Sequence, residues 1–301
     1  MRTQIARQLD QLWPQWIDWV HLTRLDRPIG SYLLLWPTLG ALWIAGAGQP
    51  DLANVLIFVI GVFLMRSAGC VINDYADRHI DGHVKRTKDR PLATGRLTAK
   101  QALSGFALLV AIAFALVLLT NPFTVALSFA GLGLASIYPF MKRHTHLPQL
   151  FLGAAYSWSI PMAFAAQSNE LPQGLWLLYF ANLTWTVAFD TIYAMVDRDD
   201  DLRIGVKSTA VLFGDLDVTM VATLMVLTGL FYLLAGQQLE LGGVYYLGWA
   251  AAQLFAGWQV WNIRQRQRDT CFRMFRLSHW YGAILFAGVA AAFALGPVNT
   301  I

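Results

Sequence analysis

Long apolar runs recur along this 301-residue chain and constrain its fold more than any other feature. A helix of about 20 apolar residues is long enough to cross the roughly 30 Å hydrocarbon core of a bilayer. Nine such runs are present, at about 29–47, 52–72, 101–120, 122–140, 148–167, 174–195, 216–236, 243–262 and 279–296. Because the backbone must satisfy its own hydrogen bonds in lipid, the pattern predicts an all-α polytopic membrane protein with nine transmembrane helices.

The composition agrees with a membrane protein. Only 13% of the residues are charged and 56% are hydrophobic, whereas about a quarter of an ordinary soluble domain is charged. This argues against a soluble enzyme and favours one membrane-embedded domain over residues 1–301. Cys70 and Cys271 lack CxxC or zinc-type spacing, so neither a disulfide framework nor a zinc site is expected. No nucleic-acid partner is expected either, because a net charge of +4 in so apolar a chain more often records membrane orientation.

The basic residues alternate from one side of the predicted bundle to the other. Except for Arg66, every Lys and Arg lies in the N-terminal segment or in a connection that follows an even-numbered run. By the positive-inside bias, segment 1–28 is cytoplasmic or interfacial, and an odd number of spans places the C-terminus on the opposite side. Trp13, Trp16 and Trp19 predict one aromatic helix face, either in the headgroup layer or in a cytoplasmic cap.

Two acidic motifs lie at the ends of predicted membrane helices, on the same side as the basic connections. The first follows the second run, and its oxygen-bearing side chains share one helix face: Asn73, Asp74, Asp77 and Asp81. The second follows the sixth run, four spans later, and consists of Asp190, Asp197 and Asp201. We expect the two clusters to face one another, and their recurrence suggests an internal repeat of a four-helix unit.

Opposed carboxylates repel unless a cation lies between them. Hard oxygen ligands without Cys or paired His favour Mg²⁺, which prefers to share its ligands with phosphate. We therefore predict Mg²⁺ and a diphosphate at Asn73, Asp74, Asp77, Asp81, Asp197 and Asp201. Basic side chains that follow the two motifs are predicted to bind the diphosphate: Arg86, Arg90, Arg203 and Lys207. One acidic motif alone could be a solvated loop. Two matched motifs at the ends of membrane helices disfavour that alternative.

Further candidates lie within or at the ends of the runs. Tyr138 and Lys142 close the fourth run one helical turn apart, where they either bind phosphate oxygens or form an ordinary aromatic belt with a positive-inside Lys. Arg66 and Asp190 are ionisable groups inside predicted spans. Buried charge in a membrane is costly and therefore indicates function, with snorkelling to the interface as the alternative.

These motifs resemble those of the UbiA superfamily of intramembrane aromatic prenyltransferases. NDxxDxxxD runs from Asn73 to Asp81, DxxxD joins Asp197 to Asp201, and YxxxK joins Tyr138 to Lys142. Longer stretches, DRPIGSYLLLWPTLGALW and YAMVDRDDDLRIGVKSTA among them, are similar to the 4-hydroxybenzoate polyprenyltransferases of bacterial ubiquinone synthesis in particular.

The resemblance implies helices around a central cavity open to lipid, Mg²⁺ dependence, a polyprenyl diphosphate donor and 4-hydroxybenzoate as acceptor. It also implies a bacterial inner membrane, in which the predicted orientation makes the N-terminus cytoplasmic and the C-terminus periplasmic. The expected reaction forms an allylic cation, which the acceptor ring attacks at the carbon ortho to its hydroxyl. Arg66, Arg27 or Arg143 would bind the acceptor carboxylate, with Arg66 favoured, and Asp190 or Asp197 would orient or deprotonate the phenol. Phe189, Tyr193 and Trp158 are candidates for stabilising the cation.

Two alternatives remain open. A relative of the same superfamily would prenylate another acceptor, such as dihydroxynaphthoate, homogentisate or haem. A divalent-cation transporter with acidic gates belongs to a different class. A transporter should carry polar residues through the membrane midplane, whereas this chain concentrates them at the cytoplasmic end of its spans.

Overall fold

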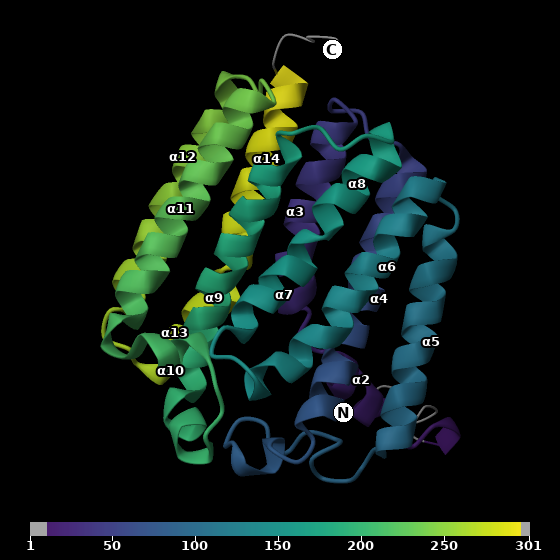
Figure 1. Cartoon of the computed structure of the whole chain (residues 1–301), viewed down its shortest axis with the longest axis vertical. Coiled ribbons are helices and arrows are strands. Elements are labelled where there is room, and N and C mark those ends of the chain that lie inside the picture. Colours follow the sequence, from purple (N-terminus) through teal and green to yellow (C-terminus); the bar gives the residue numbers. More distant parts are fainter. Residues whose placement is uncertain (1–10, 296–301) are drawn as a thin grey trace.

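The computed structural model describes residues 11–295, and all the regular structure in that range is helical (Figure 1). The long helices stand side by side in one bundle, and short helices gather at one of its ends. The α-helices in chain order are α2 Trp16–Thr23, α3 Ile29–Ala45, α4 Leu52–Asp77, α5 Ala99–Val117, α6 Pro122–Ile137, α7 Pro148–Ser157, α8 Ser159–Ser168, α9 Leu175–Ile204, α10 Thr209–Phe213, α11 Asp217–Gln238, α12 Gly243–Ile263, α13 Arg268–Leu277 and α14 His279–Leu295. Three 3₁₀ turns complete them: η1 Asp81–His83, η2 Tyr138–Arg143 and η3 Gly214–Leu216.

The membrane character of the bundle is confirmed by its helices. Five helical stretches in the described range are long and apolar enough to cross a bilayer: Leu52–Asp77, Ala99–Val117, Pro122–Arg143, Thr209–Gln238 and Arg268–Leu295. α3 is a shorter apolar helix. Large apolar side chains such as Leu108, Leu119 and Leu254 are exposed on the outside of the bundle, as expected for a surface covered by lipid. Each of the nine predicted runs coincides with a helix or a helix pair, and the number of actual spans stays a prediction.

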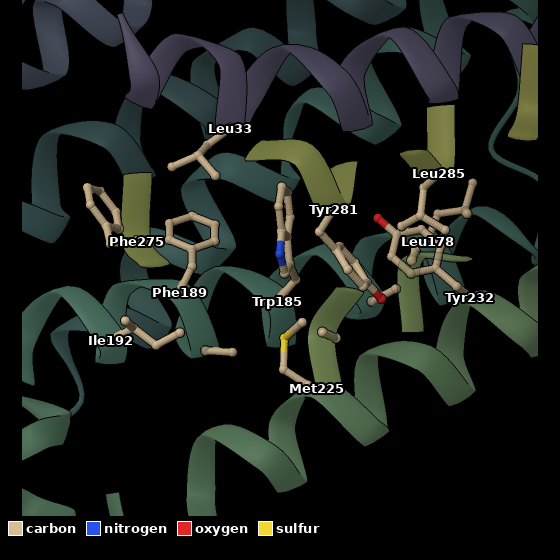
Figure 2. Packing of buried hydrophobic residues seen from close by; sticks show 14 of the residues in the cluster. Leu33, Leu178, Trp185, Phe189, Ile192, Met225, Tyr232, Phe275, Tyr281 and Leu285 are labelled. Atoms are coloured by element: carbon tan, nitrogen blue, oxygen red, sulfur yellow. The ribbon is translucent and has the colours of Figure 1, made fainter. Parts of the chain in front are cut away.

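The core of the bundle is built around α9. Figure 2 shows Trp185 and Phe189 of α9 among apolar and aromatic residues from α3, α11, α13 and α14. The ring centroids of Trp185 and Phe189 lie 5.1 Å apart in an edge-to-face arrangement, and Tyr281 lies 5.5 Å from Trp185. Edge-to-face and offset contacts of this kind add to the burial of aromatic surface. This packing fixes α9, which carries the second acidic motif.

The fifth predicted run, 148–167, is divided into α7 and α8 at Trp158. Pro161 has no N–H to donate to the carbonyl of Ser157, and its ring crowds that turn. Side chains help to satisfy the groups around the break: the Ser159 hydroxyl donates to the Tyr156 carbonyl at 3.1 Å. The Trp158 indole donates to the Leu127 carbonyl at 2.8 Å. The kink therefore belongs to a packed site and adjoins Tyr156, which faces the interior.

The N-terminal helix α2 packs beneath the bundle against α4. The ring of Trp19 occupies the space that a side chain at Gly105 of α5 would need, and Trp13 lies 6.3 Å from Trp19 between ring centroids. Two of the positive charges used to predict the orientation, Arg2 and Arg7, lie outside the described residues. The remaining basic connections all lie at the lower end of the bundle in Figure 1, opposite the end where α14 finishes.

Candidate active site

The ends of α4 and α9 carry the two acidic motifs to the same end of the bundle. Asp74 and Asp77 stand on the last turns of α4, and Asp81 stands on η1 just beyond it. Asp197 and Asp201 stand on the last two turns of α9. All five carboxylates are buried. Buried carboxylates are costly unless cations or hydrogen-bond donors surround them, so their partners define the site.

The first motif is held by three basic side chains. Arg24 donates two hydrogen bonds of 2.9 Å to the Asp74 carboxylate. Arg90 lies 2.9 Å from both Asp74 and Asp81 and bridges them. Lys142 of η2 forms an ion pair with Asp77. Each carboxylate of this motif therefore has a cation beside it.

The second motif is joined to the first through Arg86, which lies in the connection after α4. Arg86 donates from Nε to both oxygens of Asp197, at 3.1 and 3.0 Å. It also bonds to the hydroxyl of Tyr193 and lies 4.4 Å from the centroid of that ring. Arg268 of α13 approaches Asp197 to 3.5 Å and Asp200 to 3.7 Å. The connection that follows the first motif thus contacts the second motif through Arg86.

The charge of Lys142 acts on both motifs, and that of Arg86 acts on the second. Burial, with the neighbouring Asp197 carboxylate, raises the pKa of Asp201 to about 7, and Lys142 and Arg86 partly oppose that rise in pKa. Burial likewise raises the pKa of Asp81, while Arg90 lowers it. Lys142 therefore pairs with the first motif and also acts on the second. A further cation between the motifs would favour the ionised form of both carboxyls.

The donor set fits a metal that is shared with a ligand. In the described range no three Asp, Glu, His or Cys side chains converge as a cage for a metal. Asp77 Oδ1, however, is buried without a hydrogen-bond partner, which is uncommon for a polar atom in a folded protein. Asn73 donates to the other Asp77 oxygen at 3.4 Å. Mg²⁺ typically takes one or two carboxylates together with phosphate oxygens and waters, and these residues suit that arrangement.

A cavity of about 360 Å³ opens between the two motif-bearing segments. Its walls come from the residues after α4, from η2 and from the end of α9: His79, Ile80, His83, Lys142, Arg143, Ile204, Gly205 and Val206. Arg143 also donates to the carbonyl of Ala76 and so ties η2 to α4. The cavity is therefore lined by basic groups and adjoins Asp77 through Lys142.

Arg66 lies about two turns deeper on α4 and differs from the other arginines around the site. No carboxylate in the described part of the chain lies within 4.0 Å of its guanidinium. Nη1 donates to the sulfur of Cys70 at 2.6 Å, and Nε is buried without an acceptor. Tyr156, Tyr138 and Asp190 are its electrostatic neighbours. A half-buried cation without a carboxylate partner suits an anionic ligand.

Three predicted substrate-binding residues lie elsewhere or have other partners. Arg27 is 77% exposed by its side chain and pairs with its neighbour Asp26 at 3.2 Å. Arg203 is exposed on α9. Lys207 reaches the carbonyl of His144 at 3.5 Å and links two connections at the same end of the bundle. Of these three, the structure gives only Lys207 a contact near the cavity.

Several residues that complete the site belong to no recognisable motif in the sequence. Arg24 and Arg268 were counted only as charges that set orientation, yet both contact motif carboxylates. Their separations from Asp74 and Asp197, 50 and 71 residues, carry no local pattern. Cys70 does offer a signal, because it lies four residues after Arg66 and hence on the same helix face.

Comparisons with known proteins give relatives that span nearly the whole chain. A 4-hydroxybenzoate octaprenyltransferase of Pseudomonas savastanoi is 56% identical over 98% of this chain and 100% of its own length. One of Pseudomonas putida is 58% identical, again over 98% of this chain and 100% of the relative. The apo structure of a UbiA homologue from Aeropyrum pernix superposes with a TM-score of 0.76 and 26% identity, over 86% of this chain and 96% of that one.

A second solved structure shares the fold at lower identity. The UbiA homologue from Archaeoglobus fulgidus, bound to GPP and Mg²⁺, superposes with a TM-score of 0.70 and 16% identity, over 90% of this chain and 99% of that one. The sequence pattern of the UbiA prenyltransferase family matches residues 34–296, which include both acidic motifs and Arg66. From this match, the shared fold and the paired carboxylate helices, we conclude that the chain belongs to the UbiA prenyltransferase family.

Proposed function

We propose that this protein transfers a polyprenyl group from polyprenyl diphosphate to the ring carbon ortho to the hydroxyl of 4-hydroxybenzoate, in ubiquinone biosynthesis. The identity of more than half over nearly the whole chain to 4-hydroxybenzoate octaprenyltransferases supports this activity. One structural observation carries it: a half-buried arginine without a carboxylate partner lies about two turns from a pair of acidic helix ends. Donor and acceptor sites are thereby adjacent.

The donor site lies between the acidic helix ends. Asn73, Asp74, Asp77, Asp81, Asp197 and Asp201 would hold Mg²⁺, which would neutralise the diphosphate as a leaving group. Lys142 and Arg143 line the cavity and would bind phosphate oxygens. Arg86, Arg90 and Lys142 now pair with the carboxylates. When a metal diphosphate binds, these cations exchange one anionic partner for another, so no charge is left unpaired.

The acceptor site lies at Arg66. The charge of its guanidinium would attract the acceptor carboxylate, and that contact would hold the phenol ring deeper in the bundle than the diphosphate. Asp190, on α9, feels the charges of Arg66, Arg86 and Lys142 and is suited to orient the phenol hydroxyl and take its proton. Tyr138 is a neighbour of both Arg66 and Asp190.

Aromatic faces line the path between the two sites. Tyr193 stacks on Phe275 with centroids 4.2 Å apart and lies under Arg86, which places it closest to the donor end. Phe189 lies one turn deeper on α9, 6.5 Å from Tyr156. Trp158 instead donates its indole N–H to Leu127 at the α7–α8 break. Tyr193 and Phe189 are therefore the better candidates for stabilising an allylic cation.

The membrane placement completes the proposal. Nine spans would surround a cavity open to lipid in the bacterial inner membrane, with the N-terminus cytoplasmic and the C-terminus periplasmic. The basic connections gathered at one end support this orientation. The prenyl chain would then remain among lipid tails while its diphosphate reaches the charged end.

Removing divalent cations is expected to abolish the reaction. Purified protein in lipid should form prenylated 4-hydroxybenzoate with Mg²⁺ present and none after chelation, because the carboxylates and the diphosphate would repel each other without a divalent cation between them. Mass spectrometry of the lipid extract measures the product, and re-addition of Mg²⁺ is the control. Product formation that is unchanged in excess chelator would exclude a divalent-metal mechanism. A panel of other phenolic and aromatic acceptors with the same donor tests the alternative substrates.

Replacing Arg66 by Gln is expected to weaken acceptor binding. A charge-assisted hydrogen bond contributes about 1.5–3 kcal/mol, so the KM for 4-hydroxybenzoate should rise on the order of tenfold to a hundredfold. The KM for the diphosphate should not change, because Arg66 lies away from the cavity. The matched control is Arg273→Gln, which changes an arginine on the exposed face of α13. Equal changes in both KM values would place Arg66 outside the acceptor site.

A further inference from the structure

The guanidinium of Arg66 lies directly on the backbone of Gly30, in the first turn of α3. A Cβ at Gly30 would overlap Nε and Nη2 of Arg66 and would lie 2.6 Å from Cζ. Carbon atoms in folded proteins do not approach that closely, so any other residue at position 30 must displace the guanidinium. Since the clash is with the end of a flexible side chain, α3 can keep its place while Arg66 moves.

The other sides of the guanidinium are also held. Cys70 accepts from Nη1 at 2.6 Å, and the Tyr156 phenol lies close enough to Arg66 to interact with its charge. The same phenol donates to the Gly30 carbonyl at 3.4 Å. Three helices, α3, α4 and α7, therefore fix the position of one charged group. Arg24, Arg86 and Arg90 are instead fixed by carboxylates.

We infer that Gly30 is a positioning residue for the acceptor: by lacking a side chain it leaves room for the guanidinium of Arg66 and so sets where that charge meets the acceptor carboxylate. This inference rests on the proposed function. A group that orients a substrate must be placed closely, because a shift of about 1 Å can cost on the order of a hundredfold in rate. Gly30 itself contacts no substrate and acts through Arg66.

The test compares Gly30→Ala with Gly40→Ala in the purified full-length chain in lipid. Gly40 lies on the same helix, and a Cβ there meets no atom within 4 Å, so the control adds the same methyl group to α3 without displacing a side chain. Gly30→Ala should raise the KM for 4-hydroxybenzoate about tenfold or more and leave the KM for the diphosphate unchanged. The inhibition constant of neutral 4-hydroxybenzamide should also stay unchanged, because the amide brings no charge to Arg66. Gly40→Ala should resemble the wild type.

A second comparison separates positioning from general damage. In an Arg66→Ala background, Gly30→Ala should have no further effect on the acceptor KM, because the group that it would displace is gone. If Gly30→Ala alone does not yield folded protein, recovery of the Gly30→Ala/Arg66→Ala double variant supports the inference, and failure of the double variant overturns it. Matching acceptor KM values in Gly30→Ala and Gly40→Ala would also overturn it. If the wild type itself forms no prenylated acceptor, the proposed function fails instead.

Discussion

Replacing Asp77 by Asn is expected to lower the rate of prenyl transfer on the order of a thousandfold, the effect of removing one strong electrostatic group from a preorganised site. Asn keeps the shape of the side chain and removes its negative charge, so Lys142 loses its ion-pair partner and the unpartnered Oδ1 loses its value as a metal ligand. The initial rate at saturating donor and acceptor measures the effect. Asp197→Asn is expected to act in the same direction, because that carboxylate is held by Arg86 and faces the same environment.

A matched control for Asp77→Asn lies on α9. Asp199 stands between the motif residues of α9 but is exposed, so Asp199→Asn should keep full activity. All three variants should be recovered from membranes in wild-type amounts. Near-normal prenylation by Asp77→Asn would show that the first motif does not bind the metal diphosphate.

Replacing Asp217 by Ala is expected to destabilise the protein by about 3 kcal/mol. Asp217 begins α11, is completely buried, and accepts from Arg266 at 2.7 Å and Arg198 at 3.4 Å. Loss of one member of a buried ion pair leaves the others unpaired, which costs about 3–5 kcal/mol. The lower end applies here because the Arg266 side chain is 37% exposed and partly screened by water.

Asp215 provides the contrast for Asp217. Its side chain is 98% exposed and lies 3.6 Å from the same Arg198. Exposed ion pairs contribute little, so Asp215→Ala should leave the melting temperature in detergent unchanged, whereas Asp217→Ala should lower it by several degrees. Equal melting temperatures for the two variants would show that the buried cluster does not hold α9, α11 and the segment before α13 together.

The helices were predictable from the sequence because lipid leaves few other options. The runs at 52–72, 122–140 and 243–262 correspond to α4, to α6 with the start of η2, and to α12. The break at Trp158 was not predicted, although Pro161 within the run was a visible signal. α9 extends to Ile204, well beyond the predicted run, because its polar last turns are stabilised by ion pairs that hydropathy does not register. The four-helix repeat stays a prediction.

The candidate site was predictable as a set of side chains and much less as a set of contacts. Helical spacing predicted that Asp77 and Asp81 share a helix face, but α4 ends at Asp77 and Asp81 lies on η1, where Arg90 joins it to Asp74. The alternation of basic connections correctly indicated that both motifs lie at one end of the bundle. Which cation meets which carboxylate depends on how segments distant in the sequence pack, as with Arg24 and Asp74 or Arg268 and Asp197. The role inferred for Gly30 was likewise invisible, since a missing side chain gives no signal until its neighbour is known.

The lengths of α4 and α9 have one further consequence. The two helices have 26 and 30 residues. At about 1.5 Å per residue, each is longer than the roughly 30 Å thickness of the hydrocarbon core, so each extends beyond it and carries its carboxylates on the part outside. In the proposed reaction the diphosphate end of the donor, and not the length of its prenyl chain, consequently sets the position of the substrate. In prenyl diphosphates with few or many isoprene units, the bond to the diphosphate would break at the same height relative to the membrane surface.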